Sequence, residues 1–138
     1  MEEWVLMRII VDTSVLIAVI GNEPERPALI SLTAKTTIVA PRSVHWEVGN
    51  ALSAMLKRKR ISLPLARKAI EAYEQIPLQL AEVDIFQALE VANRFGIYAY
   101  DAYIIACAMN HHCPLLTLDK GLFQVAKNAA LEVLEVQS

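Results

Sequence analysis

The chain has 138 residues, 55% of them apolar and 20% charged, a balance that supplies the core of a single domain over 1–138 and excludes a disordered chain. No apolar run approaches the ~20 residues of a membrane span, and no small-residue cleavage site follows the acidic start MEEW, so we expect neither membrane segment nor signal peptide. The net charge of −2 argues against nucleic acid, but residues 42–68 hold seven Lys or Arg and one acid, whereas 69–101 hold six acids and one Arg, which predicts one basic face.

Strand and helix patterns alternate along the chain. The β-branched run RIIVD begins the series, and short apolar runs predict five strands, at 8–12, 36–41, 77–83, 115–118 and 131–136. Helical patterns lie between them, at 15–20, 25–35, 44–59, 64–75, 84–95, 102–110 and 120–129. This alternation predicts an α/β fold, a doubly wound parallel sheet with helices on both faces.

Start and stop signals accompany several of these helices. Ser43, Asp84 and Asp101 are expected N-caps, because their side chains can accept hydrogen bonds from the first free backbone N–H groups. Gly96 is expected to end the helix before Asp101. The segment AYIIACAMN that follows is apolar nearly all round, which predicts a buried helix.

Four acids are expected at one edge of the sheet. Asp12 ends the first strand within the apolar stretch IIVDTSVLI, and Asp119 follows the fourth strand. Asp101 opens the helix before that strand, and Glu47 borders the buried stripe of the helix after strand two. Ligands of such sheets bind outside the carboxyl ends of the strands, so the four carboxylates could meet there.

Each acid also has an ordinary structural role open to it. Asp12 and Asp101 could be only helix caps, Asp119 a turn residue and Glu47 an exposed helix residue. Together, however, four acids would repel one another, and a divalent cation removes that repulsion. Mg²⁺ and Mn²⁺ prefer such oxygen ligands, and a site of this kind can activate water and bind a phosphodiester.

Three stretches, VDTSVLIAVI, VHWEVGNAL and YDAYIIACAMNHHCPLLTLDKGL, resemble the PIN-domain nucleases, especially the VapC-type toxins of toxin–antitoxin pairs. The resemblance covers nearly the whole chain. It implies a five-stranded sheet in the order 3-2-1-4-5 and a metal-dependent endoribonuclease that uses Mg²⁺ or Mn²⁺. It also implies an RNA substrate and a cognate antitoxin protein as partner.

The resemblance also implies a role for each acid. Asp12, Glu47, Asp101 and Asp119 would form the catalytic quartet. Asp12, Asp101 and Asp119 would hold the metal directly or through water. Glu47 would be a further ligand or would orient the attacking water.

Two further groups are candidates for substrate binding. Ser14 and Thr117 match polar positions that often line such pockets. A basic run could contact RNA phosphates, although its position also suits a solvated helix end. The run consists of Lys57, Arg58, Lys59 and Arg60.

A homodimer is expected, because the apolar surplus of a small chain needs covering and the resemblance points the same way. Trp46, Tyr98, Trp4 and Leu6 are candidate interface residues, and Trp46 could instead stack on a base or lie in the core. Cysteines number only two, at 107 and 113, and match no disulfide framework or metal site, which favours the reducing cytoplasm.

Other functions stay open on the sequence alone. A PIN-domain nuclease in RNA maintenance is the nearest rival to a toxin, and a non-catalytic PIN-like interaction module is a third possibility. An aspartyl phosphotransferase would use Asp12 as nucleophile, but Ser14 stands where that chemistry commonly has a second acid. Whether translation starts at Met1 or Met7 is also open.

Overall fold

The computed structural model describes residues 7–136, and this part of the chain forms one five-stranded parallel sheet. Its strands are β1 (Arg8–Val11), β2 (Thr37–Pro41), β3 (Leu78–Ala81), β4 (Leu115–Leu116) and β5 (Val133–Leu134). They lie in the order β3-β2-β1-β4-β5, and each neighbouring pair is parallel. The expected fold class and strand order are confirmed, although β4 and β5 have two residues each and are shorter than expected.

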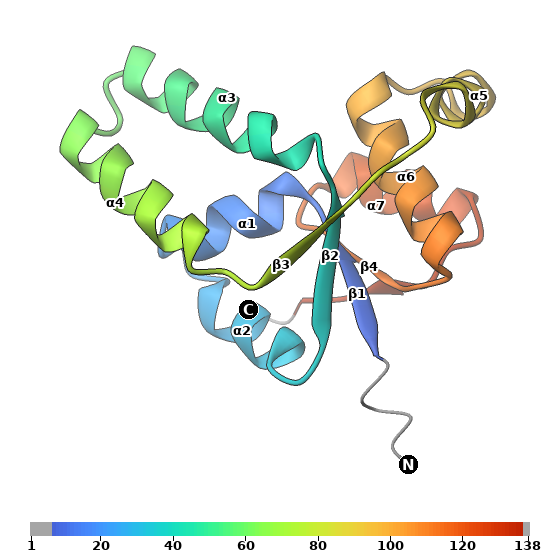
Figure 1. The fold of residues 1–138 in the computed structure, drawn as a ribbon, viewed down its shortest axis with the longest axis horizontal. Helices are drawn as coiled ribbons and strands as arrows, with labels where there is room; N and C mark the ends of the chain where they lie inside the picture. The colour runs from blue at the N-terminus through green and yellow to red at the C-terminus, as the bar shows by residue number, and fades with distance from the viewer. Residues whose placement is uncertain (1–6, 137–138) are drawn as a thin grey trace.

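The helices are α1 (Thr13–Ile20), α2 (Arg26–Thr33), α3 (Val44–Lys57), α4 (Leu63–Glu74), α5 (Ile85–Phe95), α6 (Ala99–His111) and α7 (Lys120–Asn128). Figure 1 shows α1 to α4 on one side of the sheet and α5 to α7 on the other. This division follows from right-handed crossovers, because the chain crosses the sheet in one direction from β1 to β3 and in the other from β3 through β4 to β5. β1 therefore lies at the centre, where the strand order reverses.

The core is built around β1 and α6. Ile9, Ile10 and Val11 are at most 2% exposed. α6 is buried at Ala102 and over 104–108, and its small alanine side chains allow close packing against β1 and β2. The buried helix expected from AYIIACAMN is thus confirmed. No helix in residues 7–136 is long and apolar enough to cross a membrane.

One of the three expected N-caps, Asp101, is wrong, and Ser43 occupies the N-cap position of α3 without a side-chain capping bond. Asp84 does cap α5, by accepting a hydrogen bond from a backbone N–H of its first turn at 2.9 Å. Ser43 has helical backbone angles and makes no capping bond to α3. Tyr98 occupies the N-cap position of α6, so Asp101 lies inside the first turn as its third residue. Asp101 is therefore no cap, although a carboxylate in the first turn still suits the helix dipole.

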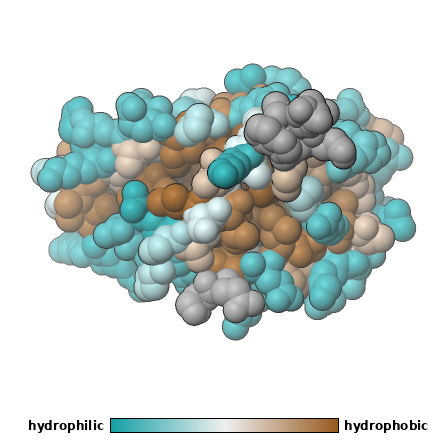
Figure 2. Space-filling view, turned by 90° about the horizontal axis from the view of Figure 1, so that it is seen from below, coloured by the Kyte–Doolittle hydropathy of each residue, from teal (hydrophilic) through white to brown (hydrophobic). Residues whose placement is uncertain are grey.

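Apolar side chains also reach the surface. Figure 2 views the molecule from the side on which β1 begins, and hydrophobic residues gather across the middle of this face, with hydrophilic ones around them. A mainly apolar groove of about 480 Å³ runs between α1, α2, β2 and the end of α4. Contiguous apolar surface of this kind marks contact sites for other proteins.

The turn from α5 to α6 depends on Gly96. Its φ of +65° places it in the left-handed region, where it ends α5 as expected from the sequence. A Cβ added there would meet nothing within 4 Å, so the cost of a side chain is a backbone cost alone.

Gly96→Ala should lower the free energy of unfolding by about 1 kcal/mol, because alanine is disfavoured in the left-handed region. Gly49→Ala is the matched control. Gly49 lies within α3, where an added Cβ also meets nothing within 4 Å, so this change should raise stability by about 0.5–1 kcal/mol. Urea denaturation measures both, and equal signs for the two variants would contradict the backbone argument.

Candidate active site

Asp12 stands at the carboxyl end of β1 and is 5% exposed. Its Oδ1 accepts hydrogen bonds from Ser14 Oγ at 2.6 Å and from the Val15 backbone N–H at 3.2 Å, and the second bond caps α1. Its Oδ2 accepts from Thr117 Oγ1 at 2.5 Å. Burial raises the pKa of Asp12, the three hydrogen bonds oppose that rise, and the nearby charge of Asp119 adds to it. The carboxylate is therefore held in one orientation at an electrostatic cost.

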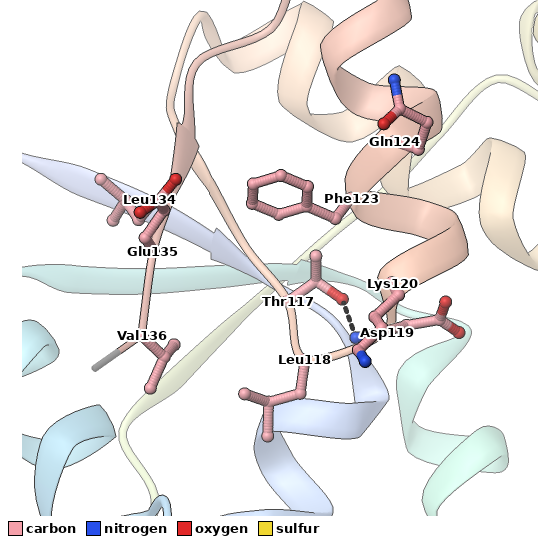
Figure 3. A pocket seen from close by; sticks show the side chains of 9 residues that line it. All are labelled: Thr117, Leu118, Asp119, Lys120, Phe123, Gln124, Leu134, Glu135 and Val136. Carbon is pink, nitrogen blue, oxygen red and sulfur yellow. Dashed lines mark hydrogen bonds between the residues drawn. The ribbon is translucent and has the colours of Figure 1, made fainter. Parts of the chain in front are cut away.

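Ser14 and Thr117 tie the loop after β4 to this carboxylate. Ser14 Oγ accepts from the Leu118 N–H at 2.9 Å, and Thr117 Oγ1 accepts from the Asp119 N–H at 3.0 Å (Figure 3). Both hydroxyl hydrogens are directed at Asp12. The two side chains therefore position Asp12 and the segment that carries Asp119, and their predicted contact with substrate stays a prediction.

Asp119 directly precedes α7 and is exposed. Its Oδ1 accepts from the Leu122 N–H at 3.0 Å and so caps the helix. The ordinary structural roles considered for Asp12 and Asp119 are thus real, since both are N-caps. Those roles are compatible with a site, because Oδ2 of Asp119 is left outside the capping bond.

Glu47 approaches the same edge from the first turn of α3. Its Oε1 accepts from Thr13 Oγ1 at 3.1 Å, whereas its Oε2 is buried and has no hydrogen-bond partner among residues 7–136. Burial raises the pKa of Glu47, and the charges of Asp12 and Asp101 raise it further, against a smaller opposing effect of the Thr13 and Ser43 hydroxyl groups. Ser43 Oγ is also buried without a partner in this part of the chain that meets hydrogen-bond geometry, although its effect on the pKa of Glu47 places it near this carboxylate. An unpartnered buried acceptor is costly.

Asp101 completes the group from the first turn of α6. It is half-buried, and both burial and the charge of Asp119 raise its pKa. Each of the four acids is thus close enough to at least one other for its charge to be felt. The structure brings the predicted quartet together at the carboxyl edge of the sheet.

The residues present fit a divalent cation. Within residues 7–136 none of the four carboxylates has a Lys or Arg ion-pair partner, and the ion pair in this part of the chain joins Arg42 to Glu82. The described side chains do not form a group of three or more acidic, His or Cys ligands that could hold one ion directly. Magnesium commonly takes one or two carboxylates and keeps several waters, which suits four acids that share one edge without touching.

The basic run lies away from the quartet. Lys57 ends α3, Arg58 follows as its C-cap, and all four side chains of the run are exposed. Ten residues separate Glu47 from Lys57 along α3, which corresponds to about 15 Å at 1.5 Å per residue. Figure 1 shows the α3–α4 tip extending away from the sheet. Phosphate contacts there would involve a distant part of a bound strand.

Sequence reasoning missed two parts of this edge. Thr13, which follows Asp12, binds Glu47 and so joins α1 to α3. A pocket of about 470 Å³ adjoins Asp119, between α7 and the end of β5 (Figure 3). The sequence feature that could have indicated the pocket is the pair Lys120 and Phe123, which follows Asp119 in the first turn of α7.

The expected interface residues are partly described. Trp46 is 71% exposed and Tyr98 90%, so neither belongs to the core. Trp4 and Leu6 lie outside the described residues. The structure therefore does not test their expected role, nor whether translation starts at Met1 or Met7.

Comparison with solved structures finds the same architecture in several proteins. PAE2754 from Pyrobaculum aerophilum is 24% identical over 88% of each chain, with a TM-score of 0.70. VapBC2 from Rickettsia felis, solved with a DNA fragment from its promoter, is 16% identical over 95% of this chain and 100% of that one, with a TM-score of 0.68. FitAcB from Neisseria gonorrhoeae is 19% identical over 92% and 96%, with a TM-score of 0.64.

No curated protein sequence matches the chain significantly. The family model of the PIN domain, however, matches residues 9–128, which include all four acids of the quartet. The chain therefore belongs to the PIN-domain family, whose members are typically nucleases.

Proposed function

We propose that the protein is an endoribonuclease that depends on Mg²⁺ or Mn²⁺ and acts as a VapC-type toxin. The observation that carries the proposal is the acidic quartet at the carboxyl edge of the sheet. Its charges repel one another, they have no Lys or Arg partner within residues 7–136, and Glu47 Oε2 is buried without a partner there. Such a group needs a cation to be stable at neutral pH.

Each acid has a role that follows from its position. Asp12 is the rigid member, because Ser14, Thr117 and the Val15 N–H hold both of its oxygens. Asp101 and Asp119 would share the cation with it, directly or through water. The cation supplies charge neutralisation at the phosphate and a more acidic water.

Glu47 acts beside this group. Its free Oε2 can accept a hydrogen bond from the attacking water and orient it, while Thr13 holds the other oxygen. The raised pKa of Glu47 also brings it closer to the range in which a carboxylate accepts a proton usefully.

The toxin role is the finer part of the proposal. It rests on the sequence resemblance to VapC-type toxins and on the likeness of fold to VapBC2. A cognate antitoxin would be the protein partner, and the apolar surface of the molecule gives such a partner something to cover. A nuclease in RNA maintenance would use the same site. Inspection of the genomic neighbours would separate the two, because a small upstream gene that overlaps this one would favour the toxin. The ordered Asp12 network argues against a non-catalytic module.

A homodimer is part of the same proposal, with a cytoplasmic location as the cysteine content suggests. Ile85, Phe86 and Leu89 lie on one face of α5 and are 51 to 65% exposed. Tyr98 and Tyr100 at the start of α6 are 90% and 57% exposed, and α6 packs against α5. An exposed apolar face of this kind could pack against the same face of a second copy of the chain and so form a symmetric dimer interface.

Asp101→Asn tests the metal site. Burial and the charge of Asp119 raise the pKa of Asp101 above its unfolded value. The contribution of Asp101 to the free energy of unfolding is therefore present at low pH and is lost as the pH rises through the raised pKa. At neutral pH without metal the Asn variant should therefore melt higher than the parent. The extra stability in saturating Mg²⁺ should shrink, because it follows RT ln(1 + [L]/Kd) and Kd rises. RNA cleavage should fall about a hundredfold.

The measurements are melting curves in EDTA, in Mg²⁺ and in Ca²⁺, with cleavage of a mixed RNA pool. Asp84→Asn is the control, because Asp84 caps α5 and Asn caps about equally well; it should behave as the parent throughout. Cleavage by the parent that survives full chelation would exclude the metal mechanism. An Asp101→Asn variant that melts and cuts like the parent would remove Asp101 from the site.

Replacing Lys57, Arg58, Lys59 and Arg60 together with Ser should weaken RNA binding and flatten its salt dependence, by about 0.7 in the log–log slope for each lost phosphate contact. Lys35→Ser, at the exposed turn before β2, is the control for loss of a single surface charge. Fluorescence anisotropy in Ca²⁺ at several salt concentrations measures both. An unchanged slope in the fourfold variant would make the run a solvated helix end.

Phe86→Ser combined with Leu89→Ser should convert a dimer to a monomer at tens of micromolar without loss of fold. Both side chains are more than half exposed, so their replacement leaves the core intact. Leu63→Ser, 70% exposed at the start of α4, should stay dimeric. Light scattering gives the mass, and a monomeric parent would contradict the dimer.

A further inference from the structure

The pocket beside Asp119 has the features of a binding site that the quartet does not use. It has a volume of about 470 Å³ and is bounded by the loop after β4, the first turns of α7 and the end of β5. Volumes of about 300–1,000 Å³ are usual for pockets that bind small organic groups. Because Thr117 and Asp119 belong to its wall, the pocket opens directly beside the proposed cleavage site.

One wall of the pocket is aromatic. Phe123 is half-buried on α7, and Figure 3 shows its ring pointing from the helix across the pocket toward β5. The ring is not needed to fill the core, since Leu122 and Ala126 form the buried side of α7. Lys127 Nζ lies over the Phe123 ring, 5.3 Å from its centroid. A partly exposed ring in a pocket offers an unpaired base a flat surface for stacking on the face that the lysine does not cover.

The polar side chains of the pocket differ in charge. Lys120 is exposed at the first position of α7 and has no ion-pair partner within residues 7–136. The Glu135 carboxylate is exposed on the wall that faces Phe123 (Figure 3). A lysine suits a phosphate, whereas an ionised carboxylate only accepts hydrogen bonds. A phosphate would be placed toward Lys120, and hydrogen-bond donors toward Glu135.

This arrangement also selects among bases. Guanine, adenine and cytosine each carry an exocyclic amino group that can donate to a carboxylate. Uracil carries oxygen acceptors in those places and can donate only from its N3–H, which lies between two oxygens. A carboxylate placed at the exocyclic position would therefore attract the amino group of the other bases and repel the uracil oxygen.

We propose that this pocket is the subsite for the base of one unpaired nucleotide next to the scissile phosphate, that Phe123 stacks on that base, and that Glu135 favours bases with an exocyclic amino group. The proposal rests on the ribonuclease function proposed above and adds the substrate's base preference to it. Lys120 holds the phosphate of the same nucleotide toward Asp119.

Phe123→Leu removes the flat ring and keeps an apolar side chain of similar volume. It should raise KM for a short single-stranded RNA by about tenfold, and weaken binding in Ca²⁺ by the same factor, since base–aromatic stacking is of this size. Phe123→Tyr keeps the ring and should restore both values. If Phe123 had only a structural role, its replacement would lower the melting temperature, and the Leu and Tyr variants would not differ in KM or in RNA binding.

Glu135→Gln tests the base preference. With the parent, mapped ends from a mixed RNA pool should show one position next to the cut at which uracil is depleted. The Gln side chain both donates and accepts, so the depletion of uracil should disappear at that position and at no other.

The outcomes separate the two proposals. A parent that neither binds nor cuts RNA overturns the ribonuclease function and the subsite with it. A parent that cuts RNA while Phe123→Leu keeps its KM, or while Glu135→Gln keeps the uracil depletion, overturns the subsite alone. Protection of the pocket by a protein partner but not by RNA would also overturn it.

Discussion

The structure depends on one constrained carboxylate, that of Asp12, at the carboxyl end of the central strand. Burial of a charged group is unfavourable unless hydrogen bonds replace its water. Here Ser14, Thr117 and a backbone N–H of α1 supply them. These bonds also join the end of β1 to the loop after β4. The site and the packing of the sheet's centre are therefore parts of the same interaction.

Around this fixed point the charges accumulate rather than cancel. Asp119 raises the pKa of Asp12 and of Asp101, and both Asp12 and Asp101 raise that of Glu47. Helix caps at Asp12 and Asp119 reduce the cost, because the positive ends of α1 and α7 face the carboxylates. They do not remove it, since Glu47 Oε2 keeps no partner within residues 7–136. This retained cost at one edge of the sheet is the feature on which the proposed cation site rests.

The molecule is asymmetric about this edge. On one side the α3–α4 tip carries the basic run, about 15 Å along α3 from Glu47. On the other side α7 and β5 enclose a pocket with Phe123 and Glu135. A single RNA strand could pass the acids with its backbone near one side and a base in the pocket on the other. Local charge would then guide the strand, and the pocket would set its register.

The sequence by itself determined the alternation of strands and helices, and with it the edge at which the acids meet. Parallel strands end at one edge, and the strand order implied by the family resemblance places β1 beside β4, so Asp12 and Asp119 were expected to lie near each other. The buried α6 was equally predictable, because its apolar residues occupy every face. These features depend on local periodicity and on connection handedness, which sequence carries directly.

Only the tertiary structure decided the details that give the site its chemistry. Asp101 lies in the first turn of α6 instead of capping it, because the helix begins at Ala99, three residues earlier than expected. Helix ends are set by backbone angles that composition does not specify. The free oxygen of Glu47, the bond from Thr13 and the distance to Lys57 depend on how α1 and α3 pack. The pocket at Asp119 needs β5, which is two residues long and placed by its pairing with β4. Contacts between segments far apart in the chain arise from packing, and no local pattern records them.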